Sequence, residues 1–152
     1  MSTQDPPVRL FTVEEANRML PLVRAIARDW LELSDSVIER RERINRLMAG
    51  RDIDADDFYG QELRQSQADL EKDLKRLREY VEELRQLGVE PKQGGMIDFP
   101  SLMDGRIVYL CWQPGEPEVL YWHDLDAGYA GRQPLTATAA ASEDEDTTPF
   151  EA

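Results

Sequence analysis

The chain has 152 residues, 32% of them charged, and a formal net charge of −13. This length suits one domain with a modest core, and no apolar run approaches the roughly 20 residues of a membrane helix. Affinity for nucleic acid comes largely from basic groups that displace counterions, so an acidic chain disfavours nucleic acid and anionic membranes alike. The first residues lack the basic start and apolar stretch of a signal peptide, and the single cysteine suits a reducing compartment. We therefore expect a cytoplasmic protein that binds neither membrane nor nucleic acid.

Residues 1–10 contain two prolines and no periodicity, which predicts a flexible leader. Thr12 and Glu15 then form a capping-box pattern at a helix start. Apolar residues recur at spacings of three and four, which predicts a helix over residues 13–49. Pro21 lies beyond the first turn, so we expect the helix to kink or restart there. The apolar stripe consists of Leu20, Val23, Ala27, Trp30, Val37, Ile44 and Met48.

A second helix is predicted over residues 58–87. Its leucines and valine alternate spacings of four and three, as in a coiled-coil seam; they are Leu70, Leu74, Leu77, Val81 and Leu84. Gly88 and Pro91 end this helix. The short acidic link makes the two helices an antiparallel hairpin, and their remaining apolar width predicts a homodimer through the helices.

Residues 96–123 have the composition of a β-unit. The segment 106–112 is apolar on both faces, and residues 118–123 form the predicted returning strand. Pairing Gln113 with Glu118 places Cys111 and His123 on opposite faces of the hairpin, whereas a shift of one residue would bring them together. An isolated hairpin is marginal, so we expect it to pack on the helical stripe.

These elements predict an α+β fold: a long antiparallel helical hairpin packed with a small antiparallel β-hairpin or sheet. The single domain is expected over residues 11–135, with a glycine-bearing loop at 124–134. Residues 136–152 contain small, acidic and proline residues, with five acids in the last ten positions. This composition predicts a disordered acidic tail.

A metal site is one interpretation of the β-unit. Cys111, Glu116, His123 and Asp126 are competent ligands for a divalent ion such as zinc, iron or manganese, with cysteine and histidine suiting zinc. No paired CxxC or HExxH spacing accompanies them. The alternative is a small buried cysteine and a histidine that is hydrogen-bonded at the end of a strand.

A ligand site is a second interpretation. The segment 128–132 is a glycine loop that ends in a guanidinium, which pairs well with carboxylate or phosphate. The candidate ligand-binding residues are Arg106, Trp112, Glu116, His123 and Arg132. The alternative is that Arg132 pairs with an acid of the chain and the aromatic residues pack a core. Acid–base chemistry would use His123 with Asp98, Glu116 or Asp126.

Several segments resemble a known family. They are Phe11-Thr12-Val13-Glu14-Glu15-Ala16-Asn17-Arg18-Met19-Leu20-Pro21, Ile97-Asp98-Phe99-Pro100, Gly105-Arg106-Ile107-Val108-Tyr109-Leu110-Cys111-Trp112, Gly115-Glu116 and Trp122-His123. Across residues 11–135 the chain resembles a family of uncharacterised prokaryotic proteins, a domain of unknown function (DUF2203). The resemblance implies a prokaryotic cytoplasmic protein and brings no activity, ligand or fold with it.

The residues favour a non-enzymatic binding or interaction protein. We expect a homodimer that presents the aromatic hairpin and the glycine-rich loop to a small anionic ligand or a protein partner. The alternative is a metal-dependent or acid–base enzyme with its site around His123.

Overall fold

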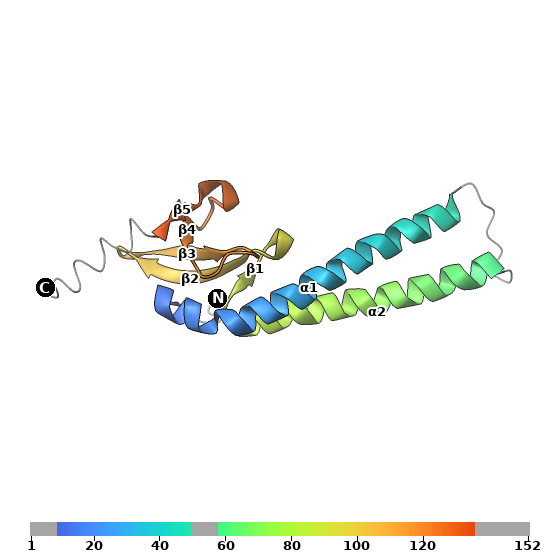
Figure 1. Ribbon diagram of the computed structural model, residues 1–152, viewed down its shortest axis with the longest axis horizontal. Coiled ribbons are helices and arrows are strands. Elements are labelled where there is room, and N and C mark those ends of the chain that lie inside the picture. Colours follow the sequence, from blue (N-terminus) through green and yellow to red (C-terminus); the bar gives the residue numbers. More distant parts are fainter. Residues whose placement is uncertain (1–8, 50–57, 136–152) are drawn as a thin grey trace, which may run out of the picture.

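The computed structural model describes residues 9–49 and 58–135. Within these ranges the chain forms two α-helices, two short 3-10 helices and a five-stranded antiparallel sheet (Figure 1). In chain order the elements are α1 (Val13–Met48), α2 (Phe58–Gln86), β1 (Glu90–Pro91), η2 (Gln93–Gly95), β2 (Ile97–Met103), β3 (Arg106–Trp112), β4 (Tyr121–Asp124), η3 (Tyr129–Gly131) and β5 (Gln133–Pro134). The predicted α+β class is confirmed. Residues 1–8 of the predicted 1–10 leader, the link at 50–57 and the tail at 136–152 lie outside the described residues.

The predicted capping box starts α1. The backbone N–H of Glu15 donates to Thr12 Oγ1, and the N–H of Thr12 donates to Glu15 Oε1, both at 3.0 Å. The helix continues through Pro21 as one element, so it does not restart there. Both helices end one residue earlier than predicted. Arg9, which the predicted boundary places in the leader, donates to the Leu87 carbonyl at 3.2 Å and so belongs to the folded domain.

The two helices pair as the predicted antiparallel hairpin, whose far half projects beyond the sheet (Figure 1). Arg40 of α1 forms ion pairs with Asp69 and Asp73 of α2, at 3.5 and 3.6 Å. Of the predicted seam, Leu84 is fully buried, and the preceding seam residues are only half-buried. No helix within residues 9–49 and 58–135 is long and apolar enough to span a bilayer.

The β3–β4 pairing differs by one residue from the predicted register. Cys111 faces Tyr121, whereas pairing Gln113 with Glu118 would have placed Leu120 opposite it. Of the two registers that the sequence leaves open, the structure has the shifted one. Since every residue along a strand alternates in direction, this single shift moves His123 to the face that carries Cys111.

The connection between β3 and β4 explains the shift. The backbone N–H of Val119 donates to Asn17 Oδ1 of α1 at 2.7 Å, and Trp112 Nε1 donates to the Glu116 carbonyl at 2.9 Å. These contacts fold residues 113–120 toward the helix as an irregular loop. The returning strand consequently begins at Tyr121 and not at residue 118.

The two faces of the sheet have different surroundings. One face packs on α1, as expected from the helical stripe; its buried residues are Ile97, Phe99, Val108, Leu110, Trp112 and Trp122, against Ala16, Leu20, Val23 and Ala27. The other face carries Asp98, Cys111 and His123, which are also buried. Figure 1 shows the helices below the sheet and the segment after β4 above it.

Candidate functional site

The sheet brings three side chains with metal-ligand chemistry together. Asp98 of β2 lies directly opposite Cys111 of β3, and His123 of β4 lies opposite Tyr109, two residues from Cys111 on the same face. Their ligand atoms all lie within 4.8 Å of one another. All three residues are 0% exposed. We call Asp98, Cys111 and His123 the buried cluster.

The hydrogen bonds of His123 direct one ring nitrogen into the cluster. Nδ1 lies 2.7 Å from the Asp124 carbonyl oxygen, which can only accept, so Nδ1 carries a hydrogen. Nε2 lies 3.1 Å from Asp98 Oδ1. In the neutral ring the Nε2 lone pair would then face a carboxylate. This arrangement requires a positive species between the two atoms, either a proton or a metal ion.

Lys92 adds a fixed positive charge beside the cluster. Its Nζ donates to Asp98 Oδ2 at 2.8 Å and lies 4.7 Å from the centre of the Tyr109 ring. Burial is the largest single influence and acts to lower the pKa of Lys92, but the hydrogen bond and the charge of Asp98, together with the nearby Tyr109 and Glu90, raise the pKa above its ordinary value. The Asp98 carboxylate therefore has a charged partner on one oxygen and His123 on the other.

Cys111 is held as a neutral thiol. Burial, followed by the charge of Asp98, raises the pKa of the thiol to about 12, while Arg132 acts in the opposite direction. A thiol in this state is a poor nucleophile at neutral pH. Both nitrogens of His123 are already engaged with Asp124 and Asp98, so the cluster lacks the geometry of a Cys–His–Asp nucleophilic triad, in which the histidine activates the thiol.

Arg132 and Glu116 form a bidentate ion pair, although the buried Nε of Arg132 has no hydrogen-bond partner. Nη2 of Arg132 donates to both carboxylate oxygens of Glu116 at 2.8 Å, and Nη1 donates to Gln113 Oε1 at 3.2 Å. The guanidinium also lies 4.1 Å from the centre of the Tyr121 ring. The pair therefore ties the segment after β4 to the end of β3. This geometry matches the alternative in which Arg132 pairs with an acid of the chain.

The remaining candidates lie away from the cluster. Arg106 pairs with Asp124 at the far end of β3, Trp112 is part of the hydrophobic core, and Asp126 is exposed in the turn after β4. Of the four predicted metal ligands, Cys111 and His123 are brought together. Their third partner is Asp98, which the sequence indicates only as an acid–base partner of His123.

Asp98 could have been identified from the sequence as a site residue, whereas Lys92 could not. Asp98 stands between Ile97 and Phe99 in a predicted strand, so its side chain had to leave the core face. Lys92 follows Pro91 and precedes the Gly94-Gly95 joint, and no spacing rule connects it to Asp98. Only the fold of η2 brings its ammonium to the carboxylate.

Fold and site together define an α+β protein with a helical hairpin on one face of an antiparallel sheet and a buried Asp–Cys–His cluster on the other. The family model of the uncharacterized conserved protein DUF2203 matches residues 9–135, and the chain belongs to this family. The match includes Arg9, in agreement with its contact to Leu87. No curated protein and no solved structure matches the chain.

Proposed function

We propose that this protein binds a divalent transition-metal ion, zinc in the first place, through Asp98, Cys111 and His123. The observation that carries the proposal is the orientation of His123. Its Nδ1–H is held by the Asp124 carbonyl, and its Nε2 faces Asp98 Oδ1 at 3.1 Å. Metal-binding histidines usually donate their other ring N–H to a carbonyl or carboxylate, which fixes the tautomer in this way.

The donor atoms and their spacing fit a zinc-type ion. Sulfur, nitrogen and oxygen are all zinc ligands, and bonds of about 2.0–2.3 Å place neighbouring ligand atoms about 3–4 Å apart in a tetrahedron. The cluster lies within 4.8 Å, so small side-chain rotations would suffice. A thiolate favours zinc or iron over manganese, which prefers oxygen ligands.

Charge also supports an ion. A bound divalent cation would convert the Cys111 thiol to a thiolate, and the ligand set would then carry two negative charges against the two of the metal. The hydrogen bond from Lys92 would orient the Asp98 carboxylate toward the metal ion. Three protein ligands leave a fourth position open, the arrangement of zinc sites that bind a further molecule. We place this binding protein in the cytoplasm, where a reducing environment keeps Cys111 as a thiol.

Metal content tests the proposal. Untagged protein would be purified without chelator and analysed by elemental mass spectrometry, and metal-free protein would be titrated with Co²⁺, whose absorption reports tetrahedral coordination by a thiolate. We expect near-stoichiometric zinc or iron and a Co²⁺ spectrum that disappears in Cys111→Ser and His123→Ala. Asp126→Asn is the matched control, because Asp126 is an exposed acid outside the cluster.

Folded protein that holds no metal and gives no Co²⁺ spectrum would overturn the proposal. The same result would assign the positive species between His123 and Asp98 to a proton, making the cluster a buried ion pair. Loss of the spectrum in Asp126→Asn would instead point to a site outside the cluster.

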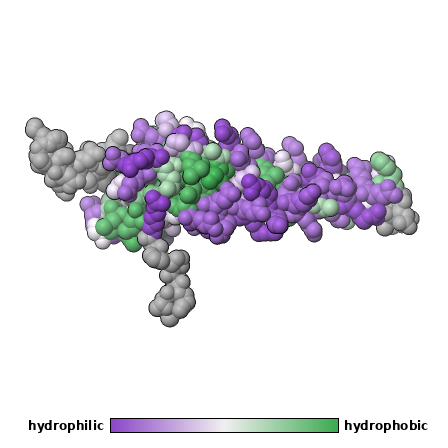
Figure 2. Space-filling model, turned by 90° about the horizontal axis from the view of Figure 1, so that it is seen from below, coloured by the Kyte–Doolittle hydropathy of each residue, from purple (hydrophilic) through white to green (hydrophobic). Residues whose placement is uncertain are grey.

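We further propose that two copies associate through their helices into a coiled-coil-like bundle. The α2 seam is only half-buried by α1, and Leu22 of α1 is 51% exposed. Figure 2 shows hydrophobic surface gathered toward the sheet end of the molecule and mostly hydrophilic surface over the projecting hairpin. A second hairpin packed near Leu22 would cover the apolar positions that one hairpin leaves open.

Sedimentation equilibrium tests this association. We expect a dimer that Leu22→Glu converts to monomer. Leu125→Glu, at a leucine that is 53% exposed in the turn after β4, should remain dimeric. A monomeric wild-type protein at micromolar concentration would exclude the helix-mediated dimer.

A further inference from the structure

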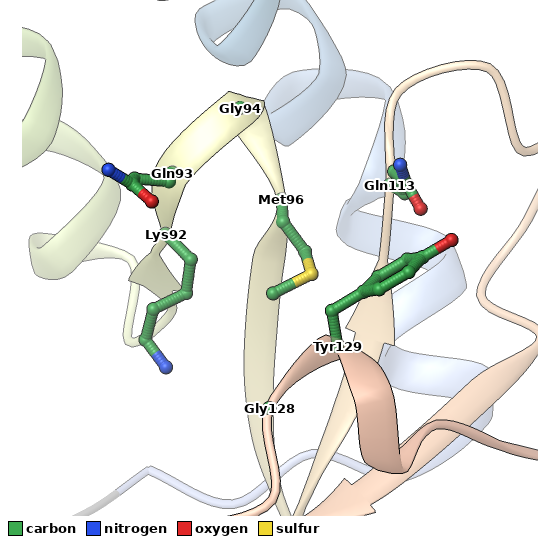
Figure 3. A pocket seen from close by; sticks show the side chains of 7 residues that line it. All are labelled: Lys92, Gln93, Gly94, Met96, Gln113, Gly128 and Tyr129. Carbon is green, nitrogen blue, oxygen red and sulfur yellow. The ribbon is translucent and has the colours of Figure 1, made fainter.

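A cleft lies beside the buried cluster. Its volume is about 500 Å³, and its lining comes from three parts of the chain: the η2 segment, the residue after β3 and the start of η3. The lining residues are Lys92, Gln93, Gly94, Met96, Gln113, Gly128 and Tyr129 (Figure 3). This volume falls within the range of about 300–1,000 Å³ typical of small-molecule sites.

The charge of the cleft differs from that of the whole protein. The chain carries 31 acidic residues against 18 lysines and arginines, yet among the described residues that line the cleft Lys92 is charged and none is acidic. The Lys92 side chain is 37% exposed while its ammonium donates to Asp98. It can therefore meet a second anion from the cleft side. A negatively charged group is the ligand that this wall recognises.

The opposite wall is aromatic and amphipathic. Tyr129 is 58% exposed on η3, and the centre of its ring lies 5.3 Å from the Arg132 guanidinium. Figure 3 shows Lys92 and Gln93 on one side of the cleft, Gln113 and Tyr129 on the other, and Met96 between them. Thioether and ring surfaces favour a flat apolar body. Arg132 fixes Gln113 through its Oε1 at 3.2 Å, so the amide NH₂ of Gln113 is the group that can donate to a ligand.

We propose that this cleft binds a small aromatic carboxylate, with Lys92 holding the carboxylate and Tyr129 and Met96 contacting the ring. The inference goes beyond the metal site and does not depend on it, because none of the three cluster residues lines the cleft. The two sites share one contact, the hydrogen bond of Lys92 with Asp98.

Ligand-observed NMR with defined probes tests the proposal. Benzoate, phenylacetate and 1-naphthoate would be titrated into the full chain, with benzamide as a neutral counterpart of benzoate and inorganic phosphate as an anion without a ring. We expect at least one aromatic carboxylate to bind in the millimolar range or tighter. Benzamide and phosphate should bind at least about tenfold more weakly, because benzamide lacks the negative charge and phosphate lacks the aromatic ring.

Variants locate the binding. Lys92→Met and Tyr129→Ser should each lower the affinity for the tightest-binding carboxylate by about tenfold or more. Tyr129 is exposed, so its replacement leaves the fold intact if Lys92→Met proves unstable. Lys75→Met, at an exposed lysine of α2, is the matched control and should bind as wild type does.

Three results would overturn the proposal: no binding by any of the carboxylates, equal binding of benzamide, or unchanged affinity in Tyr129→Ser. Metal content is measured on the same preparations. If the protein binds metal but no carboxylate, only the proposal for the cleft is refuted. If it is metal-free but binds a carboxylate, only the proposal for the metal site is refuted.

Discussion

Each face of the sheet contains fully buried side chains, but the two faces are stabilised by different interactions. The face toward α1 buries hydrocarbon and aromatic side chains, among them Phe99 and Leu110, each 0% exposed. The opposite face buries the carboxylate of Asp98, the thiol of Cys111 and the imidazole of His123, each of which is also 0% exposed. Apolar burial stabilises the folded state directly, whereas buried polar groups stabilise it only when every one has a partner. The first face therefore stabilises the fold through apolar burial, whereas the stability of the second depends on the hydrogen bonds and ion pairs of its buried polar groups.

The largest expected effect lies on the apolar face. Phe99→Ala removes a fully buried ring that packs edge-on against Phe11 at 5.3 Å. We expect the free energy of unfolding to fall by about 3–5 kcal/mol, with or without added zinc. Urea unfolding measures the change. Leu102→Ala, at a residue that is 60% exposed, is the control and should change it by less than about 0.5 kcal/mol. If the loss in the free energy of unfolding in Phe99→Ala depended on zinc, the two faces would not be energetically independent.

The next effect belongs to the polar face and depends on metal. Zinc that binds only folded protein should raise the free energy of unfolding by about 2.7 kcal/mol at a hundredfold excess over its Kd. Cys111→Ser should lose most of this gain because a hydroxyl is a poor substitute for thiolate. Thermal or urea unfolding with buffered zinc measures it. Equal zinc stabilisation of wild type and Cys111→Ser would mean that the ion binds elsewhere.

A third effect appears only at alkaline pH and in the metal-free protein. Burial raises the pKa of the Cys111 thiol from 9.0 to about 12. Stability from the neutral thiol is therefore complete below pH 9.0 and is lost as pH rises toward 12, since the unfolded chain releases its proton first. Wild type should lose up to about 1.4 kcal/mol per pH unit in this window relative to Cys111→Ala. Urea unfolding with chelator at several pH values measures this difference, and a difference independent of pH would contradict the burial of the thiol.

The smallest effect is expected at the exposed edge of the face toward α1, where Arg106 and Asp124 alternate in phase with Val108 and Trp122. Arg106 and Asp124 form an ion pair whose side chains are 56% and 41% exposed. Arg106→Gln should lower the free energy of unfolding by less than about 1 kcal/mol, because exposed pairs contribute little. Zinc affinity and carboxylate binding should not change. A change in either affinity would mean that the Arg106–Asp124 pair contributes to ligand binding.

Much of the fold could be predicted because its signals are local. Thr12 and Glu15 set the start of α1 through contacts three residues apart, and the Asp104-Gly105 turn, with φ of 53° and 79°, joins β2 to β3. The register of β3 and β4 could not be predicted in this way. It depends on the bond from Val119 to Asn17, 102 residues away in the chain.

The site was predictable only in part for the same reason. Cys111 and His123 were identifiable by chemistry, since they are the only cysteine and histidine of the chain. Their juxtaposition required the correct register, and Lys92 reaches Asp98 only through the fold of η2. Glu116 and Asp126 have suitable chemistry but lie outside the cluster. Glu116 is held by its ion pair with Arg132, and Asp126 lies in an exposed turn.

The outer strands of the sheet have a consequence for aggregation. β1 and β5 form its two edges, each is two residues long, and each ends in a proline, Pro91 or Pro134. Proline has no N–H to offer an incoming strand, and a two-residue edge is too short to template one. A concentrated solution of this protein should therefore resist edge-to-edge fibril growth.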